Sequence, residues 1–204
     1  STAEVCSTRA LRALTDERKW QLLLQVANAI EYLHNRTPQH AVHRDIKTNN
    51  ILVTQAWLAK LADFGLAELH ASSTGATAGA TLFAAHSTAG TFAFKAPEQF
   101  DKHGVIGRAA DIYGFAGVML HVLTGRAPFA ALQVAQIVKR KLTDKLPPPE
   151  LKALEESKTL HARAQAEFLA RCFAFEPAAR PTAAAAAAFC KSQLDLAEQA
   201  AATA

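Results

Sequence analysis

The polar stretch that decides the fold reads His43-Arg44-Asp45-Ile46-Lys47-Thr48-Asn49-Asn50. It places one acid, a histidine, two cationic residues and two amides between two apolar segments. Apolar residues at helical spacing precede the stretch, and a short β-prone run at 51–53 follows it. The sequence therefore predicts a polar loop where a helix gives way to a strand, and loops held by rigid elements often carry catalytic residues.

The elements on either side of this loop can be read outward from it. Residues 11–35 are predicted to form a helix with Thr15 as its cap. Residues 51–53 and 58–61 are predicted to pair as a small hairpin, with Asp63-Phe64-Gly65 directly after its second strand. Further helices are expected at 109–123, ended by Gly125, at 131–142 and at 160–173. A last helix is expected to begin at Thr182, whose hydroxyl can cap it.

Composition limits the class of protein. A chain of 204 residues that is 50% hydrophobic can bury a core of one domain. Its 22 basic and 18 acidic residues give a net charge of +4, without the dense basic stripe of a nucleic-acid-binding protein. The one basic cluster, Lys139-Arg140-Lys141 with Lys145, is interpreted as a solvated helix face.

The cysteines and the apolar runs indicate the cellular compartment in which the chain is expected to fold. Cys6, Cys172 and Cys190 are too few and too far apart for a disulfide framework or a zinc site, so a reducing compartment is expected. No apolar run reaches the roughly 18 residues that a membrane span requires. We expect a cytoplasmic chain with no membrane segment, although the full-length protein could be tethered to a membrane.

Three short motifs follow one another in a specific order. Asp63-Phe64-Gly65 begins 18 positions after Asp45, and Ala96-Pro97-Glu98 lies farther downstream. With this order and spacing the chain resembles the protein kinase family, which carries His-Arg-Asp, Asp-Phe-Gly and Ala-Pro-Glu signatures. The segments 111–129 and 172–182 are similar to later parts of the same family, so the resemblance covers about residues 11–196.

The resemblance implies a fold. It is mainly α: the helical C-terminal lobe of the protein-kinase-like α+β fold, with a small β-hairpin and without the N-terminal lobe. That lobe would occupy residues 1–196, with an activation segment at 63–98 and an alanine-rich tail at 197–204. No Gly-rich loop and no strand lysine with a partner glutamate precede the first helix. We therefore expect the chain alone to have little or no activity and the missing N-terminal lobe to be a partner.

The resemblance also implies a chemistry, namely phosphoryl transfer from ATP to a protein substrate. Asp45 would orient the substrate hydroxyl and accept its proton, and Lys47 would place a positive charge beside the transferred phosphoryl group. Asn50 and Asp63 would supply hard oxygen ligands to Mg²⁺ on the ATP phosphates, since carboxylate and amide oxygens suit that ion. ATP and Mg²⁺ are thus the expected cofactors.

Two further residues of the site follow from the resemblance. Leu52 would form the apolar floor under the adenine. Thr91 would hydrogen-bond toward Asp45 and Lys47, which is the pattern of serine/threonine-specific enzymes. The segments 111–129 and 172–182 are most similar to the tyrosine-kinase-like branch of those enzymes.

Other residues receive structural roles from the resemblance. His43 and Phe64 are expected in a packed apolar column anchored by Asp111. Glu98 and Arg180 are expected to form a buried ion pair that ties the activation segment to the late helices.

Arg44 beside the catalytic aspartate suggests regulation, because a guanidinium in that position needs an anionic partner. Residues 71–89 consist largely of Ala, Ser, Thr and Gly, so a loop is expected there. Ser87 and Thr88 are its best-placed hydroxyls, and we expect phosphorylation at one of them to order the loop.

Simpler interpretations exist for each motif. Asp45 could cap a turn, Lys47 could be a solvated side chain, and Asp63-Phe64-Gly65 could be an ordinary turn after a strand. Three functions follow from these choices: a serine/threonine kinase whose N-terminal lobe lies outside this sequence, a truncated non-catalytic lobe that acts as a binding scaffold, and an unrelated metal-dependent hydrolase using His43, Asp45 and Asp63. The hydrolase leaves Ala96-Pro97-Glu98 unexplained.

Overall fold

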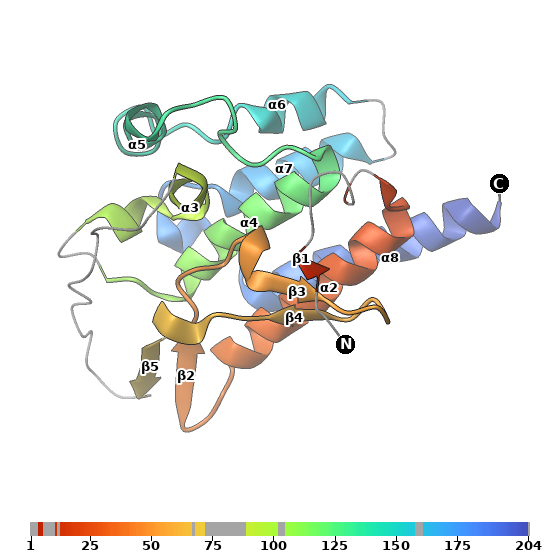
Figure 1. The fold of residues 1–204 in the computed structure, drawn as a ribbon, viewed down its shortest axis with the longest axis horizontal. Helices are drawn as coiled ribbons and strands as arrows, with labels where there is room; N and C mark the ends of the chain where they lie inside the picture. The colour runs from red at the N-terminus through yellow and green to blue at the C-terminus, as the bar shows by residue number, and fades with distance from the viewer. Residues whose placement is uncertain are drawn as a thin grey trace.

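Helix α4 (Arg108–Thr124) is the centre around which the other elements are arranged (Figure 1). The computed structural model describes residues 4–5, 11, 13–66, 68–71, 89–101, 105–157 and 161–203. Every residue from Ala110 to Val122 is buried, as expected for a helix that is apolar on all sides. Gly125 ends the helix in the left-handed conformation, with a φ of 67°. The predicted central helix is therefore confirmed.

Helices α2 (Asp16–His34) and α8 (Ala183–Ala202) pack along each other beside α4 (Figure 1). The side chains of Thr15 and Thr182 cap their N-termini by accepting hydrogen bonds from Arg18 N and Ala185 N, each at 3.2 Å. Both caps were expected. Helix α8 continues through most of the alanine-rich tail, because alanine has the highest helix propensity.

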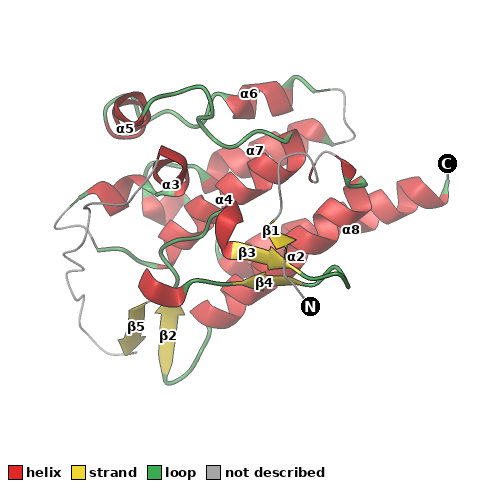
Figure 2. Ribbon diagram, in the orientation of Figure 1, coloured by secondary structure: helices red, strands yellow, loops and turns green. Residues whose placement is uncertain are grey.

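Two small antiparallel sheets flank the polar loop (Figure 2). The expected hairpin pairs β3 (Ile51–Val53) with β4 (Ala59–Leu61), and β1 (Glu4–Val5) adds a third strand on β3. A second sheet pairs β2 (Gln39–Val42) with β5 (Glu68–Ala71) and was not predicted. Its strands are short and contain polar residues, so they lack the apolar alternation that identifies a strand in a sequence.

The remaining helices cover α4 and agree with the sequence in part. Helix α5 (Val134–Leu142) begins three residues later than predicted. Helix α7 (Ala162–Cys172) begins two residues later and ends one residue earlier than predicted. Helix α6 (Glu150–Glu155) directly after three prolines was not predicted. Its first residue explains its position, because the Glu150 carboxylate accepts from the backbone N–H groups of Phe129 (2.9 Å) and Ala130 (3.1 Å). The other elements are α3 (Ala89–Phe94) and the 3₁₀ turns η1 (Thr48–Asn50), η2 (Phe64–Leu66), η3 (Pro97–Phe100) and η4 (Pro177–Ala179).

The interpretation of the basic cluster as a solvated face is wrong for one of its members. Lys139 has a side chain that is 68% exposed, but Lys141 is only 1% exposed. The Lys141 ammonium donates to the carbonyls of Phe92 (3.0 Å), Ala93 (2.9 Å) and Lys95 (2.5 Å). The last carbonyls of a helix have no partner within that helix, so a lysine from α5 supplies the donors at the end of α3.

Among the described helices, none combines the length and the apolar character that crossing a membrane would require. This agrees with the absence of a long apolar run in the sequence.

Candidate active site

Residues 43–50, called the catalytic loop below, connect β2 to β3 and are held by Asp111 from α4. The Asp111 carboxylate accepts from the backbone N–H of His43 (2.9 Å) and of Arg44 (2.7 Å), and it also contacts His34 Nε2 at 2.9 Å. Asp111 is 1% exposed and His43 is fully buried. Because Arg44 has a positive φ of 68°, these two backbone bonds hold the loop in a turn that side chains rarely adopt unaided.

The Asp45 carboxylate is the point on which the loop converges. Its Oδ2 accepts from Lys47 Nζ at 2.7 Å and from Asn50 Nδ2 at 3.0 Å. Asn50 Nδ2 also donates to the Asp45 carbonyl at 2.8 Å. In the part of the chain that the structure describes, Asp45 Oδ1 accepts no hydrogen bond, so the two carboxylate oxygens have different surroundings.

Asp63 is brought to the loop by the residue before it. The Ala62 N–H donates to the Asn50 carbonyl at 2.8 Å, and the Ala62 carbonyl lies 3.1 Å from His43 Nε2. Asp63 itself is exposed and has a φ of 62°, a conformation that Asp tolerates better than most residues. The Gly65 N–H lies 3.4 Å from Asp63 Oδ1. The expected metal ligands Asn50 and Asp63 thus lie on neighbouring, bonded segments.

The residues available could hold Mg²⁺. Among the described residues no three His, Cys, Asp or Glu side chains gather as a metal site. Two oxygen ligands suffice for Mg²⁺, which usually keeps waters and substrate phosphates in its coordination shell. The Asn50 amide nitrogen is used toward Asp45, which leaves the amide oxygen for a ligand. The donor set fits this ion.

The exposure of Phe64 differs from the prediction. It was expected in the core, and it does contact the His43 ring, with centroids 4.9 Å apart, but it is 49% exposed. The contact with His43 is therefore present, but the ring is not buried as expected. Leu52, the expected adenine floor, is half-buried in β3.

The activation segment is described only in part. Ser87 and Thr88, the expected phosphorylation sites, lie outside the described residues. Burial lowers the pKa of Arg44, and the nearby charge of Asp111 partly raises it again. Thr91 lies half-buried in α3, and within the described ranges no hydrogen bond joins it to Asp45 or Lys47.

Lys95 is a residue of the site that sequence reasoning missed. Burial lowers the pKa of its ammonium, while the charge of Asp45 raises that pKa and the charge of Lys47 lowers it. Lys95, Asp45 and Gln99 line the same small cavity. The only signal in the sequence is a cation directly before Ala96-Pro97-Glu98, which says nothing about where its side chain lies.

Gln99 links this segment to the catalytic loop. Its side-chain oxygen accepts from Ala96 N at 2.8 Å, and its nitrogen donates to the Arg44 carbonyl at 2.8 Å. The Gln99 side chain is therefore bonded to the neighbours in sequence of both Lys95 and Asp45, and it is 5% exposed.

The expected ion pair between Glu98 and Arg180 is present. The two guanidinium nitrogens Nη1 and Nη2 lie 2.6 and 2.8 Å from the two carboxylate oxygens. Arg180 also donates to the carbonyls of Ala174, Ala109 and Phe175. Its side chain is fully buried and that of Glu98 is 12% exposed, so the pair joins η3 to the chain before α8 in a largely dry environment.

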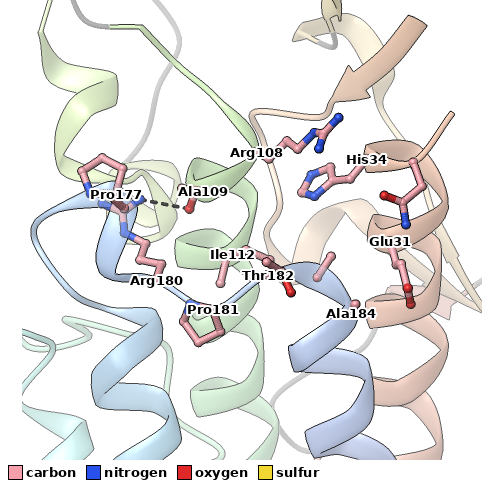
Figure 3. Close-up of a pocket in the computed structure, with 13 residues that line it drawn as sticks. Glu31, His34, Arg108, Ala109, Ile112, Pro177, Arg180, Pro181, Thr182 and Ala184 are labelled. Carbon is pink, nitrogen blue, oxygen red and sulfur yellow. Dashed lines mark hydrogen bonds between the residues drawn. The ribbon is translucent and has the colours of Figure 1, made fainter. Parts of the chain in front are cut away.

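A cavity of about 410 Å³ lies between α2, the start of α4 and the start of α8 (Figure 3). Figure 3 shows Arg108 and His34 on one side of it and Arg180, bonded to Ala109, on another. No residue of the catalytic loop lines the cavity, so it is separate from the candidate active site.

Comparisons with known proteins point to one family. The family model described as the protein kinase domain matches residues 3–190. An L-type lectin-domain containing receptor kinase of Arabidopsis thaliana is 41% identical over 116 residues, which are 56% of this chain and 16% of the relative. LysM domain receptor-like kinase 3 of the same plant is 39% identical over 106 residues, 52% of this chain and 15% of the relative.

A longer match comes from another organism. The probable serine/threonine-protein kinase drkD of Dictyostelium discoideum is 32% identical over 176 residues, which are 81% of this chain and 12% of the relative. The chain thus spans less than a fifth of the length of each of these three relatives.

Proposed function

Because this chain belongs to the protein kinase family, we propose that it carries the catalytic residues of an enzyme that transfers the γ-phosphate of ATP to serine and threonine hydroxyls of proteins. The observation that carries the proposal is the bonding around one carboxylate. Lys47 and Asn50 both bond Oδ2 of Asp45 and leave Oδ1 without a partner among the described residues. The serine/threonine preference is supported by the names of the relatives.

Asp45 is the proposed base. The substrate oxygen forms a bond to the γ-phosphorus, the bond from that phosphorus to the bridging oxygen of ADP breaks, and the hydroxyl proton passes to Asp45 Oδ1. Lys47 holds the carboxylate in position at 2.7 Å and adds a positive charge beside the reacting oxygens. Because phosphoryl transfer mainly requires positioning and neutralisation of spreading negative charge, these two roles suit the reaction.

Asn50 and Asp63 would hold Mg²⁺ on the ATP phosphates. When bound, the ion would neutralise part of the phosphate charge. The chain's own contribution is to fix both side chains through the bond between Ala62 N and the Asn50 carbonyl. Leu52 would lie under the adenine and Thr91 beside the acceptor hydroxyl, in an enzyme of the tyrosine-kinase-like branch.

Residues 1–204 by themselves are expected to transfer phosphate weakly or not at all. They provide a base, one cation and two metal ligands, whereas efficient transfer needs several more groups that hold the phosphates. A non-catalytic lobe that serves as a binding scaffold is the second candidate. The buried core around α4 supports this second candidate, because it can hold the lobe together whether or not the lobe catalyses a reaction.

The test compares phosphate transfer by the whole protein and by its Asp45→Asn variant, using radiolabelled ATP, Mg²⁺ and a library of serine- and threonine-containing peptides. Loss of the base should lower turnover at least about 100-fold. Asp195→Asn, an exposed change of the same chemistry on α8, is the matched control and should leave turnover unchanged. No transfer by the wild-type whole protein, or equal transfer by Asp45→Asn, would remove the enzymatic proposal and leave the scaffold.

A further inference from the structure

Thr48 is a residue of the catalytic loop that the proposed mechanism does not use. Its hydroxyl Oγ1 lies 3.2 Å from Nδ1 of His121, a residue in the last turn of α4. Thr48 is 6% exposed and His121 is 8% exposed, so little water competes for this hydrogen bond. Because the hydroxyl is buried against α4, it is not available to a substrate, and Thr48 is not itself a catalytic residue.

The hydrogen bond between Thr48 and His121 joins two uncharged side chains that are 73 positions apart. Burial lowers the pKa of His121, which keeps its ring neutral at neutral pH. Either tautomer of the neutral ring makes this bond, because a hydroxyl can both donate and accept. Removing one partner leaves the other polar group buried without this bond, whereas replacing both by apolar groups leaves no such group.

His121 holds the end of the catalytic loop, whereas Asp111 holds its beginning. Asp111 accepts from the backbone N–H groups of His43 and Arg44. His121 follows Asp111 by ten positions on the same helix. Ten helical residues correspond to about 15 Å along the axis. Helix α4 therefore supports the loop along its length and not at one end alone.

The turn that Thr48 begins, η1, has few hydrogen bonds of its own. It consists of three residues, and its N-cap residue Lys47 makes no side-chain capping bond. Asn50 N donates to the Lys47 carbonyl at 3.0 Å, and Ile51 N donates to the Thr48 carbonyl. A single 3₁₀ turn is weakly stable alone, because few bonds compensate for the entropy that its residues lose. The bond from Thr48 to His121 adds a tertiary contact that restrains this turn.

The residues at both ends of this turn are the ones that contact Asp45. Lys47 Nζ lies 2.7 Å and Asn50 Nδ2 lies 3.0 Å from the same carboxylate oxygen, Oδ2. We propose that His121 is a positioning residue for phosphoryl transfer, which acts through Thr48 to keep Lys47 and Asn50 in place around the Asp45 carboxylate. This role rests on the proposed function, because that function makes Asp45 the base.

The first test is a double-mutant cycle on phosphate transfer by the whole protein, at a temperature at which thermal unfolding shows every variant to be folded. Thr48→Val and His121→Phe each remove one partner, and each should lower kcat about 10-fold while KM for the peptide changes less than about twofold. The double variant should be no slower than the slower single variant, because all three lose the same bond. Thr48→Ser and His121→Asn keep a polar atom at the bonding position and should retain kcat within about threefold.

The second test is hydrogen exchange of the whole protein, followed by mass spectrometry, which needs no catalysis. In Thr48→Val and His121→Phe the backbone amides of Asn50 and Ile51 should exchange at least about fivefold faster than in the wild type, because η1 opens more often. The amides of β2 should exchange as they do in the wild type.

Thr124→Val is the matched control. It removes a hydroxyl from the last residue of the same helix, where that hydroxyl donates to the carbonyls of Leu120 (2.7 Å) and Arg126 (3.2 Å). The variant loses polar bonds of α4 but keeps the contact between Thr48 and His121. It should therefore leave kcat and the exchange of the catalytic loop unchanged, even if it lowers stability.

The outcomes separate this inference from the proposed function. Additive losses in the cycle, or an unchanged kcat in folded Thr48→Val, would overturn the positioning role and leave His121 as a stabilising residue only. Faster exchange of η1 in both single variants, with no phosphate transfer by the wild type, would retain His121 as the restraint on this loop and remove the kinase proposal. Phosphate transfer that is equal in all variants, with unchanged exchange, would do the reverse.

Discussion

Gly114 of α4 lies directly against the backbone of Ile46 in the catalytic loop. A Cβ atom placed on Gly114 would come within 2.7 Å of the Ile46 carbonyl oxygen and 3.0 Å of its Cβ. Contacts this short to a backbone cannot be relieved by rotating a side chain. The loop that carries Asp45 is therefore seated on a position where α4 has no side chain.

Gly114→Ala should lower the free energy of unfolding by about 1–3 kcal/mol, the usual range for overpacking a well-packed core. Urea denaturation measures the change. Gly107→Ala, at the N-cap of the same helix, is the control for adding a methyl group without a clash, because nothing lies within 4 Å of a Cβ at that residue. Equal stability of the two variants would mean that the loop can move away from α4 without loss.

Arg180→Ala should destabilise the protein by about 3–5 kcal/mol, because it leaves the Glu98 carboxylate without its buried partner. It also removes the donor to three carbonyls. Arg163→Ala on α7 removes an exposed arginine that pairs with Glu167 and should have little effect. Chemical denaturation of both variants checks the prediction, which fails if their midpoints agree.

Lys141 should make the stability of the folded protein vary with pH in the alkaline range. Burial, with the like charges of Arg180 and Lys95, places the pKa of Lys141 well below its ordinary value of 10.5. Between that lowered pKa and 10.5 the unfolded chain binds more protons than the folded one, so this group makes stability rise as pH rises. The destabilising effect is fully present below the lowered pKa and is gone above 10.5.

The measurement is the free energy of unfolding of the wild type minus that of Lys141→Met at several pH values from 7 to 10.5. We expect this difference to increase with pH, by at most about 1.4 kcal/mol per pH unit for one proton. Lys139→Met changes an exposed residue in the same helix, and the corresponding difference for this variant should not change with pH. A difference that is flat or falls with pH would contradict the prediction.

Cys172 and Cys190 should react slowly with thiol reagents in the folded protein. Both are fully buried. Burial raises the pKa of Cys172 to about 12 and also raises the pKa of Cys190, so almost no thiolate is present at pH 8. Iodoacetamide labelling followed by peptide mass spectrometry should find both unmodified in buffer and modified in denaturant. Rapid labelling of either in buffer would show that α7 and α8 separate readily.

The sequence predicts well those features that depend on neighbouring residues. Thr15 and Thr182 cap helices as expected, and Gly125 ends α4 where a glycine should. Asp45 and Asn50 are five positions apart, so a single turn is enough to bring them together.

Features that depend on distant contacts could not be predicted. Lys141 follows the spacing of a surface helix, and only the carbonyls at the end of α3 explain its burial. Lys95 and Asp45 line the same small cavity, where Gln99 bonds the carbonyl of Arg44, 55 positions before it. Phe64 is apolar and contacts the His43 ring, yet it is 49% exposed. In each case the position of the side chain depends on residues far away in the sequence, and no local sequence pattern indicates that contact.

The bonds from Asp111 to the catalytic loop have a consequence for synthesis of the protein. Asp111 lies 67 positions after Arg44, and both of its oxygens accept backbone N–H groups of the loop. A ribosome adds about 5–20 residues per second, so the loop waits roughly 3 to 13 s for its anchor to be made. Until then the backbone N–H groups of His43 and Arg44 lack the acceptor that holds the turn. The newborn chain should therefore acquire its reactive carboxylate geometry late, and a nascent polypeptide stalled before Asp111 should leave this loop open to proteases.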